Sequence, residues 1–361
     1  MNSLYCSGTG KVRTRAAYDR GYLNIDGGLL AVTRKRQHFV PRMHLQHFTG
    51  SEPRGQVWTY DALNGQVRSA TPEQTGVENH FYSFLGIDGT MDTRIEDFLS
   101  SVESKASPVY EEILQEHVPE KTQGRADFAN FLALMHVRTP GIRRMRAEFA
   151  SHLHQLRSYV CAKNEEQFEE FVNGFGKHRG HLTQIQKDYI QRNMIDSSDF
   201  IVEVPKELTL DVLAASDKIA PLLFDMNWSI VKSRHGFFIT SDSPVVCLND
   251  PWTANRKDGH HGFYDRTAKV IFPLSPRFLL RLSWEEAPIR FAIERDHVMH
   301  LNRCLAAHAE RYLYAHLKDK RLKKLAAEFK DKRPTIAVAT TSGLRPKRFA
   351  ETHVRRRPTH S

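Results

Sequence analysis

Hydrophobic and polar residues alternate most clearly in two short runs of the chain. The runs are Gln56–Tyr60 and Gln66–Ala70, and Asn64-Gly65 lies between them. Asn-Gly between two alternating runs is typical of a β-hairpin, because both residues accept the positive φ angles that a tight hairpin turn requires. The pattern therefore predicts an antiparallel hairpin over residues 56–70.

From about Met91 to Phe224, apolar residues recur at spacings of three and four, which is typical of helices with one buried face. The second of these helices is expected to end at Arg138-Thr139-Pro140, since a residue before proline avoids the α region. The apolar pattern from Leu208 to Phe224 predicts a further buried helix. The three clearest apolar stripes are Ile95, Phe98, Leu99 and Val102; Phe128, Phe131, Leu132 and Met135; and Phe149, Leu153, Leu156 and Val160.

After Phe224 the pattern changes to short runs rich in β-branched and aromatic residues, separated by turn clusters such as Arg234–Gly236. These runs predict a small antiparallel sheet. Apolar residues at Val298, Leu301 and Leu305 then predict one long helix, from about Asp296 to Phe329. The strand-like runs are Trp228–Lys232, Phe237–Thr240, Val245–Leu248, Val270–Phe272 and Phe278–Leu282.

The predicted fold class is α+β: an N-terminal β-hairpin, a helical middle, a small C-terminal antiparallel sheet and a long C-terminal helix. We expect residues 36–317 to form a single domain. Residues 1–35 have no hydrophobic period and predict a flexible basic N-terminal arm. Residues 318–361 predict a basic helix extension and a disordered tail.

The net charge of +10 is concentrated at the two ends of the chain. Residues 318–361 contain 14 Lys and Arg against 4 Asp and Glu, and residues 1–36 contain 7 against 2. Residues 37–317 therefore contain 31 against 36 and are mildly acidic. Flexible basic segments attract polyanions without specificity, so nucleic acid is an expected partner through the basic termini. No apolar run reaches the roughly 18–20 residues that span a bilayer, which favours a cytoplasmic protein without membrane contact.

Several short motifs occur in an order that resembles the bacterial family of domain of unknown function 4238, from about Arg36 to Tyr314. The most specific motifs are His38-x-Val40-Pro41 and Thr240-Ser-Asp-x-Pro244. The family pattern favours tyrosine or phenylalanine at His44 and asparagine at His47, so these two residues depart from it. The resemblance implies a fold and a set of marked positions, without an activity. The other motifs are Val57–Asp61, Glu78–Tyr82, Arg138–Pro140, Phe272–Pro276, and Asn302 with Ala309–Arg311.

Four polar residues in these motifs are candidate catalytic residues: His38, Glu78, Arg138 and Asp242. A histidine followed within three residues by proline opens the metal-binding fold of some His-Asn-His nucleases, where an imidazole activates water against a phosphodiester. A carboxylate at a strand end, among hydroxyl groups, can ligate a metal or act as a base. His38 and Asp242 are therefore the candidate ligands of a divalent metal.

Each candidate also has a structural interpretation. His38 can fix the first strand through its ring nitrogens, and Asp242 can cap a turn through backbone N–H groups. Arg138 can stabilise a helix end or pair with a carboxylate such as Glu103. Glu78 and Asn302 can satisfy buried backbone groups. His44 and His47, three residues apart, could join His38 around a metal, but a half-exposed turn of ordinary histidines is favoured.

Two functional hypotheses follow from these residues. The first is a metal-assisted hydrolase that acts on nucleic acid, with His38, Glu78, Arg138 and Asp242 in one site. The second is a non-catalytic binding or regulatory protein, of a bacterial defence or toxin system, whose marked residues are structural. The chain has no Gly-x-x-x-x-Gly-Lys-Ser/Thr, Gly-x-Gly-x-x-Gly or Gly-x-Ser-x-Gly motif, which disfavours nucleotide-dependent and serine hydrolase chemistry.

Overall fold

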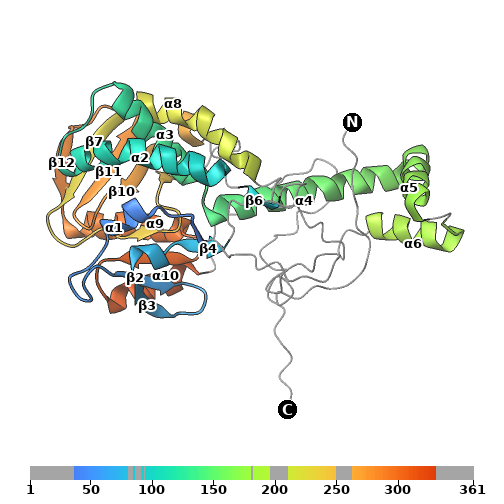
Figure 1. Ribbon diagram of the computed structural model, residues 1–361, viewed down its shortest axis with the longest axis horizontal. Helices are drawn as coiled ribbons and strands as arrows, with labels where there is room; N and C mark the ends of the chain where they lie inside the picture. The colour runs from blue at the N-terminus through green and yellow to red at the C-terminus, as the bar shows by residue number, and fades with distance from the viewer. Residues whose placement is uncertain are drawn as a thin grey trace, which may run out of the picture.

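The computed structural model describes residues 36–79, 84–85, 91–92, 94–179, 182–195, 210–248 and 262–330. The predicted N-terminal arm, the predicted disordered tail beyond residue 330, and residues 80–82 of the Glu78–Tyr82 motif lie outside them. Figure 1 shows a body of sheets and helices from which one long helix extends. We call the described residues of 36–137 and 210–330 the body, and those of 140–195 the helical projection.

The predicted hairpin is confirmed. Strands β2 (Val57–Asp61) and β3 (Val67–Ala70) pair antiparallel, with Thr59 opposite Arg68. Gly65 in the turn has a φ of +70°, a conformation that glycine adopts without a steric penalty. The carboxylate of Asp61 accepts a hydrogen bond from the N–H of Leu63 at 3.0 Å, which fixes the start of the turn.

The hairpin belongs to a four-stranded sheet that includes two strands from late in the chain. Strand β13 (Tyr312–Ala315) pairs antiparallel with β2, and β8 (Thr240–Ser241) pairs antiparallel with β13. This pairing corrects the predicted long C-terminal helix: α9 (Arg295–His308) ends before β13, and α10 (Lys320–Phe329) starts after it. The run Tyr312–Ala315 favours a strand because aromatic residues suit a pleated, half-buried surface.

The second sheet has five strands, and four of them pair antiparallel as predicted. Strand β12 (Arg290–Ile293) instead runs parallel to its neighbour, so the sheet is mixed. The predicted strand over Phe237–Thr240 is wrong for its first three residues, because only Thr240 enters a strand. The order is β12-β7-β11-β10-β9, with β7 at Asn227–Ser233, β9 at Val246–Leu248, β10 at Lys269–Pro273 and β11 at Phe278–Ser283.

Short elements complete the body. These elements are β1 (Arg36–His38) paired with β4 (Val77–Asn79), α1 (Arg42–Gln46), β5 (Phe84–Leu85) paired with β6 (Met91–Asp92), and the 3-10 turns η2 (Pro72–Gln74), η3 (Leu210–Ala215) and η4 (Gly262–Tyr264).

The core of the body lies on both faces of the five-stranded sheet. Leu280 of β11 packs in one cluster with Phe131 and Phe272, whereas Leu279 packs in a second cluster with residues of α9 and β13. Successive residues of a strand point to opposite faces, so the sheet is covered on both sides. Figure 1 shows the helices of the first cluster over one face: α2 (Arg94–Leu114), α3 (Gln123–Val137) and α8 (Ser216–Asp225).

The predicted stripe of α3 is buried, and that of α2 is buried except at its start, where Phe98 is 51% exposed.

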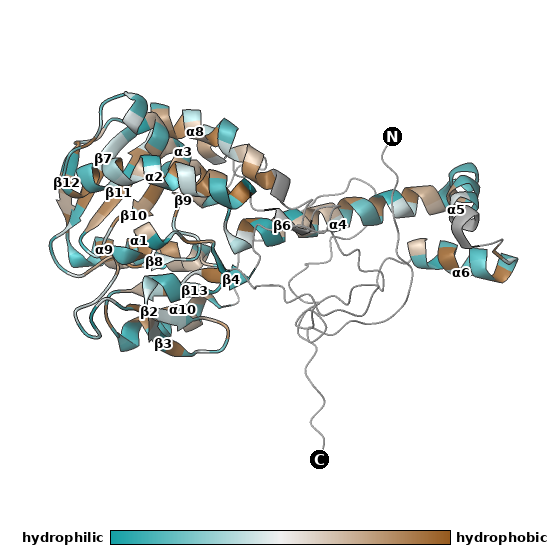
Figure 2. Cartoon of the chain, viewed as in Figure 1, coloured by the Kyte–Doolittle hydropathy of each residue, from teal (hydrophilic) through white to brown (hydrophobic). Residues whose placement is uncertain are grey.

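The helical projection consists of α4 (Pro140–Lys163), α5 (Glu165–Arg179) and α6 (Gln184–Ile195). The predicted helix over the third stripe is confirmed, but its predicted burial is wrong: Leu153 is 46% exposed and Val160 is 52% exposed. Figure 2 shows hydrophobic and hydrophilic positions interleaved along α4 as it leaves the body. Among the described helices, none is long and apolar enough to cross a membrane.

Candidate functional site

Asp242 holds the turn between α9 and β13. It follows β8 directly and is 1% exposed. One carboxylate oxygen accepts a hydrogen bond from the N–H of Glu310 at 2.8 Å. The other accepts from the N–H groups of Arg311 at 2.7 Å and Tyr312 at 2.8 Å. Both oxygens therefore bind backbone, and we call this arrangement the Asp242 clamp.

The clamp matches the capping interpretation of Asp242, but the capped turn lies far along the chain. Burial raises the pKa of the Asp242 carboxyl to about 7, although the three N–H groups favour the charged form and oppose that rise. The clamp also explains why the predicted C-terminal helix is interrupted. The N–H groups of residues 310–312 bond to a carboxylate instead of to helix carbonyls.

The two charged side chains of the clamped turn are tied to different elements. Arg311 binds Asp61 through two nitrogens, with Nε at 3.0 Å and Nη2 at 2.6 Å from Oδ2. Burial favours a higher pKa for Asp61, but the hydrogen bonds from Arg311, Leu63 and Asn64 and the charge of Arg311 together outweigh it, so the pKa is lowered. On the other side, Glu310 binds Nε and Nη2 of Arg144 in α4 at 2.9 and 3.1 Å. The turn thus joins the hairpin to the start of the helical projection.

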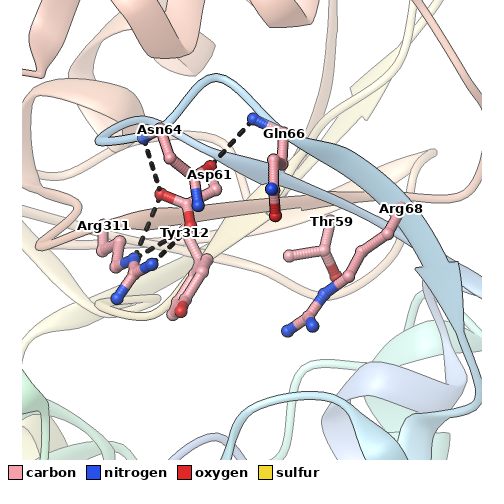
Figure 3. Close-up of a pocket in the computed structure, with 7 residues that line it drawn as sticks. All are labelled: Thr59, Asp61, Asn64, Gln66, Arg68, Arg311 and Tyr312. Carbon is pink, nitrogen blue, oxygen red and sulfur yellow. Dashed lines mark hydrogen bonds and ion pairs between the residues drawn. The ribbon is translucent and has the colours of Figure 1, made fainter.

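A polar pocket of about 80 Å³ lies between the clamped turn and the hairpin. Sheet register explains its composition: Thr59 pairs with Arg68 on one side and Tyr314 on the other, while Asp61 pairs with Tyr312. Residues two apart on a strand face the same side, so these side chains share one face of the sheet. The lining residues are Thr59, Asp61, Asn64, Gln66, Arg68, Arg311 and Tyr312 (Figure 3).

The structure places His38 and Arg138 near one another. Arg138 is buried and donates from Nη1 to Glu103 at 2.8 Å, as one interpretation of the sequence expected. Burial lowers the pKa of His38, an interaction with the backbone of Val40 and the charge of Glu103 raise it, and the charge of Arg138 lowers it further. Within the described part of the chain, the buried Nδ1 of His38 has no hydrogen-bond partner.

Glu78 and Asp242 belong to other groups of contacts. Glu78 lies opposite Gln37 in the β1–β4 pair and binds Nη2 of Arg143 at 3.2 Å. Since neighbouring residues of a strand face opposite sides, Glu78 and His38 are on different faces of this two-stranded ribbon. Both oxygens of the predicted metal ligand Asp242 bind backbone N–H groups, and no group of three or more metal-binding side chains occurs among the described residues. A catalytic role for the four candidates stays a prediction.

His44 is fully buried, so the expectation of a half-exposed histidine turn is wrong for this residue. Tyr110 donates its hydroxyl proton to the carbonyl of Leu274 at 2.7 Å. The Tyr110 oxygen must therefore accept from Nδ1–H of His44 at 2.9 Å, and Nε2 of His44 accepts from Thr240 at 2.8 Å. Both ring nitrogens are used in a neutral chain of hydrogen bonds that links α1, α2 and β8.

Sequence reasoning did not identify Gln66, Arg68 or Tyr312 as site residues. The hairpin register alone indicates that Arg68 lies opposite Thr59, because the position of Asn64-Gly65 sets the pairing. Nothing local indicates that Tyr312 joins them, since that contact depends on β13 pairing with β2 across most of the chain.

Comparison with known proteins gives one match. No curated protein and no solved structure matches the chain. A family model described as "Protein of unknown function (DUF4238)" matches residues 36–319. The matched segment begins at β1 and ends just before α10, so it includes the Asp242 clamp, the polar pocket and the helical projection. The match confirms the resemblance drawn from the short motifs, and the chain belongs to the DUF4238 family.

Proposed function

We propose that this protein is a non-catalytic binding protein, in which the motif residues stabilise the conformation of a binding surface. The Asp242 clamp is the observation that carries the proposal. A general base or a metal ligand must direct a lone pair at its substrate or ion. Three of the roughly four acceptor sites of the Asp242 carboxylate bind backbone N–H groups at 2.7 to 2.8 Å, and the residue is 1% exposed.

Two other motif residues support the same proposal. Asn302 accepts a hydrogen bond from the N–H of Ile239 at 3.1 Å and donates to the carbonyl of Phe237 at 2.8 Å, so it replaces a missing strand partner for this segment. Arg138 pairs with Glu103 while its side chain is 2% exposed. Hydrogen bonds and ion pairs of this kind tie motif residues to the rest of the fold, which is a structural role.

A cleavage assay tests the proposal. The purified protein is incubated with single- and double-stranded DNA and RNA in Mg²⁺, Mn²⁺ or Zn²⁺, beside His38→Ala. We expect no cleavage by either protein. Cleavage by the wild type that disappears in His38→Ala, with an unchanged melting temperature, would establish catalysis and refute the proposal.

A second candidate function is metal-assisted hydrolysis of nucleic acid. The buried, unpartnered Nδ1 of His38 favours it, because a buried ring nitrogen without a hydrogen bond is costly unless another group uses it. This function predicts that Zn²⁺ or Mn²⁺ raises the melting temperature of the wild type but not of His38→Ala. His297→Ala, which removes an exposed histidine, is the matched control.

The basic termini would supply nonspecific attraction to nucleic acid in the second candidate function. A chain that ends at residue 330 lacks the basic tail and keeps all of α10. Weaker binding of this shortened chain to DNA or RNA is the expected result, and unchanged binding would show that the tail is not the contact surface.

A further inference from the structure

The polar pocket between the hairpin and the clamped turn carries an excess of positive charge. Its lining contains two guanidinium groups, from Arg68 and Arg311, and one carboxylate, from Asp61. Arg311 is held by Asp61 through bonds of 2.6 to 3.1 Å, so these two charges largely compensate one another. Within the lining, no second carboxylate compensates the positive charge of Arg68.

Arg68 is exposed and belongs to the middle of the hairpin's second strand. Among the described residues, no carboxylate forms an ion pair with it, in contrast to Arg311 and Arg144 nearby. Figure 3 shows the guanidinium groups of Arg68 and Arg311 on the same side of the hairpin, with the ring of Tyr312 between them. An arginine in this position is available to a ligand that enters the pocket.

The other lining groups are hydrogen-bonding side chains. Asn64 and Gln66 supply amides, and Thr59 and Tyr312 supply hydroxyls. The volume of about 80 Å³ is several times the space that a single water molecule needs. Donors from three strands or turns around so small a space suit one compact polar group better than a flat apolar ligand.

Three of the lining residues, Asn64, Arg311 and Tyr312, are already held in place. The N–H of Gln66 donates to the side-chain oxygen of Asn64 at 2.9 Å, which holds the turn. The guanidinium carbon of Arg311 lies 4.8 Å from the centre of the Tyr312 ring, and the clamp holds the backbone of both residues. A ligand that binds here does not have to order these groups, so little affinity is lost to ordering.

We propose that this pocket binds a single phosphate group carried by a small molecule, and that Arg68 is its principal contact. The inference rests on the proposed binding function and names the ligand class of that surface. A phosphate presents oxygens in a tetrahedral arrangement and can accept from donors on several sides, whereas a carboxylate presents two oxygens in one plane. The donors of this pocket come from β2, β3 and the turn before β13, which favours the tetrahedral group.

Titration with inorganic phosphate tests the proposal. Side-chain amide signals of Asn64 and Gln66 are followed by NMR at constant ionic strength, with acetate and chloride as competing anions. We expect phosphate to shift both signals at lower concentration than acetate does. Arg68→Gln should weaken phosphate binding roughly ten- to hundredfold, which corresponds to the loss of a charge-assisted hydrogen bond. The phosphate affinity of Arg68→Lys should lie between those of the wild type and Arg68→Gln, because lysine keeps the positive charge but lacks the planar guanidinium group.

Arg54→Gln is the matched control, since it removes the same charge from an exposed arginine that precedes β2. Equal weakening by Arg54→Gln would show a general charge effect and overturn the proposal. So would a wild-type protein whose Asn64 and Gln66 signals do not respond to phosphate. If phosphate fails to bind and nucleic acid is not cleaved, only this inference is lost; cleavage of nucleic acid by the wild type would remove the proposed binding function itself.

Discussion

The body and the helical projection use helices of similar hydrophobic periodicity in opposite ways. In α3 the stripe residues Phe128 and Phe131 are at most 1% exposed and pack against a sheet. In α4 the stripe residues Leu153 and Val160 are 46% and 52% exposed. Figure 2 shows hydrophobic positions interleaved with hydrophilic ones along α4, outside the body. The spacing of apolar residues therefore indicates that a helix has an apolar side, but not what covers it.

The two regions also differ in how their polar groups are used. In the body, Asp242, His44 and Asn302 are buried and connect segments far apart in the sequence. In the projection, the described contacts are mostly between neighbouring helices, around a small cluster formed by Ala162, Phe168, Val172 and Met194. Buried contacts between distant segments make a region unfold as one unit, whereas a small local core opens at lower free energy.

Replacement of Asp242 gives the largest expected difference between the two regions. Asp242→Ala leaves three N–H groups without their acceptor, and each such group costs about 1–3 kcal/mol if it stays buried. We expect the free energy of unfolding in urea to fall by about 4 kcal/mol. Glu166→Ala, which removes an exposed carboxylate from the projection, should change it by less than about 0.5 kcal/mol. A loss below about 0.5 kcal/mol in Asp242→Ala, no larger than that of Glu166→Ala, would show that the clamp is dispensable.

A smaller effect is expected from the protonation of His44. Burial lowers the pKa of His44 well below its usual value of 6.5, so the folded protein keeps this histidine neutral while the unfolded chain takes up a proton below that value. The stability that neutral His44 contributes is complete above pH 6.5 and is lost as pH falls towards the lowered pKa. Between pH 7.5 and 5.5, the wild type should lose more stability than His44→Phe does, by at most about 1.4 kcal/mol, the value for one pH unit below 6.5. The measurement is urea unfolding of both proteins at each pH, and parallel pH profiles would contradict the neutral hydrogen-bond chain.

The smallest effect is expected in the projection. Leu153→Ser and Val160→Ser replace half-exposed apolar side chains, so little buried area is lost. Each should change the unfolding free energy of the body by less than about 0.5 kcal/mol. By contrast, Leu45→Ala removes a fully buried side chain of the body and should cost about 2–5 kcal/mol. A large loss of unfolding free energy in Leu153→Ser would mean that another surface covers α4 in solution. The apolar stripes of the body and of the projection would then both be buried.

Features set by local residues were predictable from the sequence. The hairpin followed from Asn64-Gly65, the end of α3 from Thr139-Pro140, and the change from helices to strands from the β-branched and aromatic runs after Phe224. Each of these depends on the conformational preferences of a few adjacent residues.

Features set by distant contacts were not predictable. The break between α9 and β13 depends on a carboxylate in another part of the chain, and the burial of His44 depends on Tyr110 and Thr240. The pocket requires both a hairpin register, which the sequence indicates, and the pairing of β13 with β2, which it does not. The sequence motif points to Asp242, but the partners of its oxygens come from residues 310–312, which the motif does not indicate.

Amide hydrogen exchange at residues 310–312 tests most directly whether Asp242 is a clamp. The N–H groups of Glu310, Arg311 and Tyr312 donate to its carboxylate at 2.7 to 2.8 Å. In the wild type, these three amides should be strongly protected and should exchange only when the body opens. In Asp242→Asn, one acceptor oxygen is replaced by a donor, so protection at these amides should fall while protection in β7 and β11 is kept. Fast exchange of the three amides in the wild type, or unchanged protection in Asp242→Asn, would contradict the clamp.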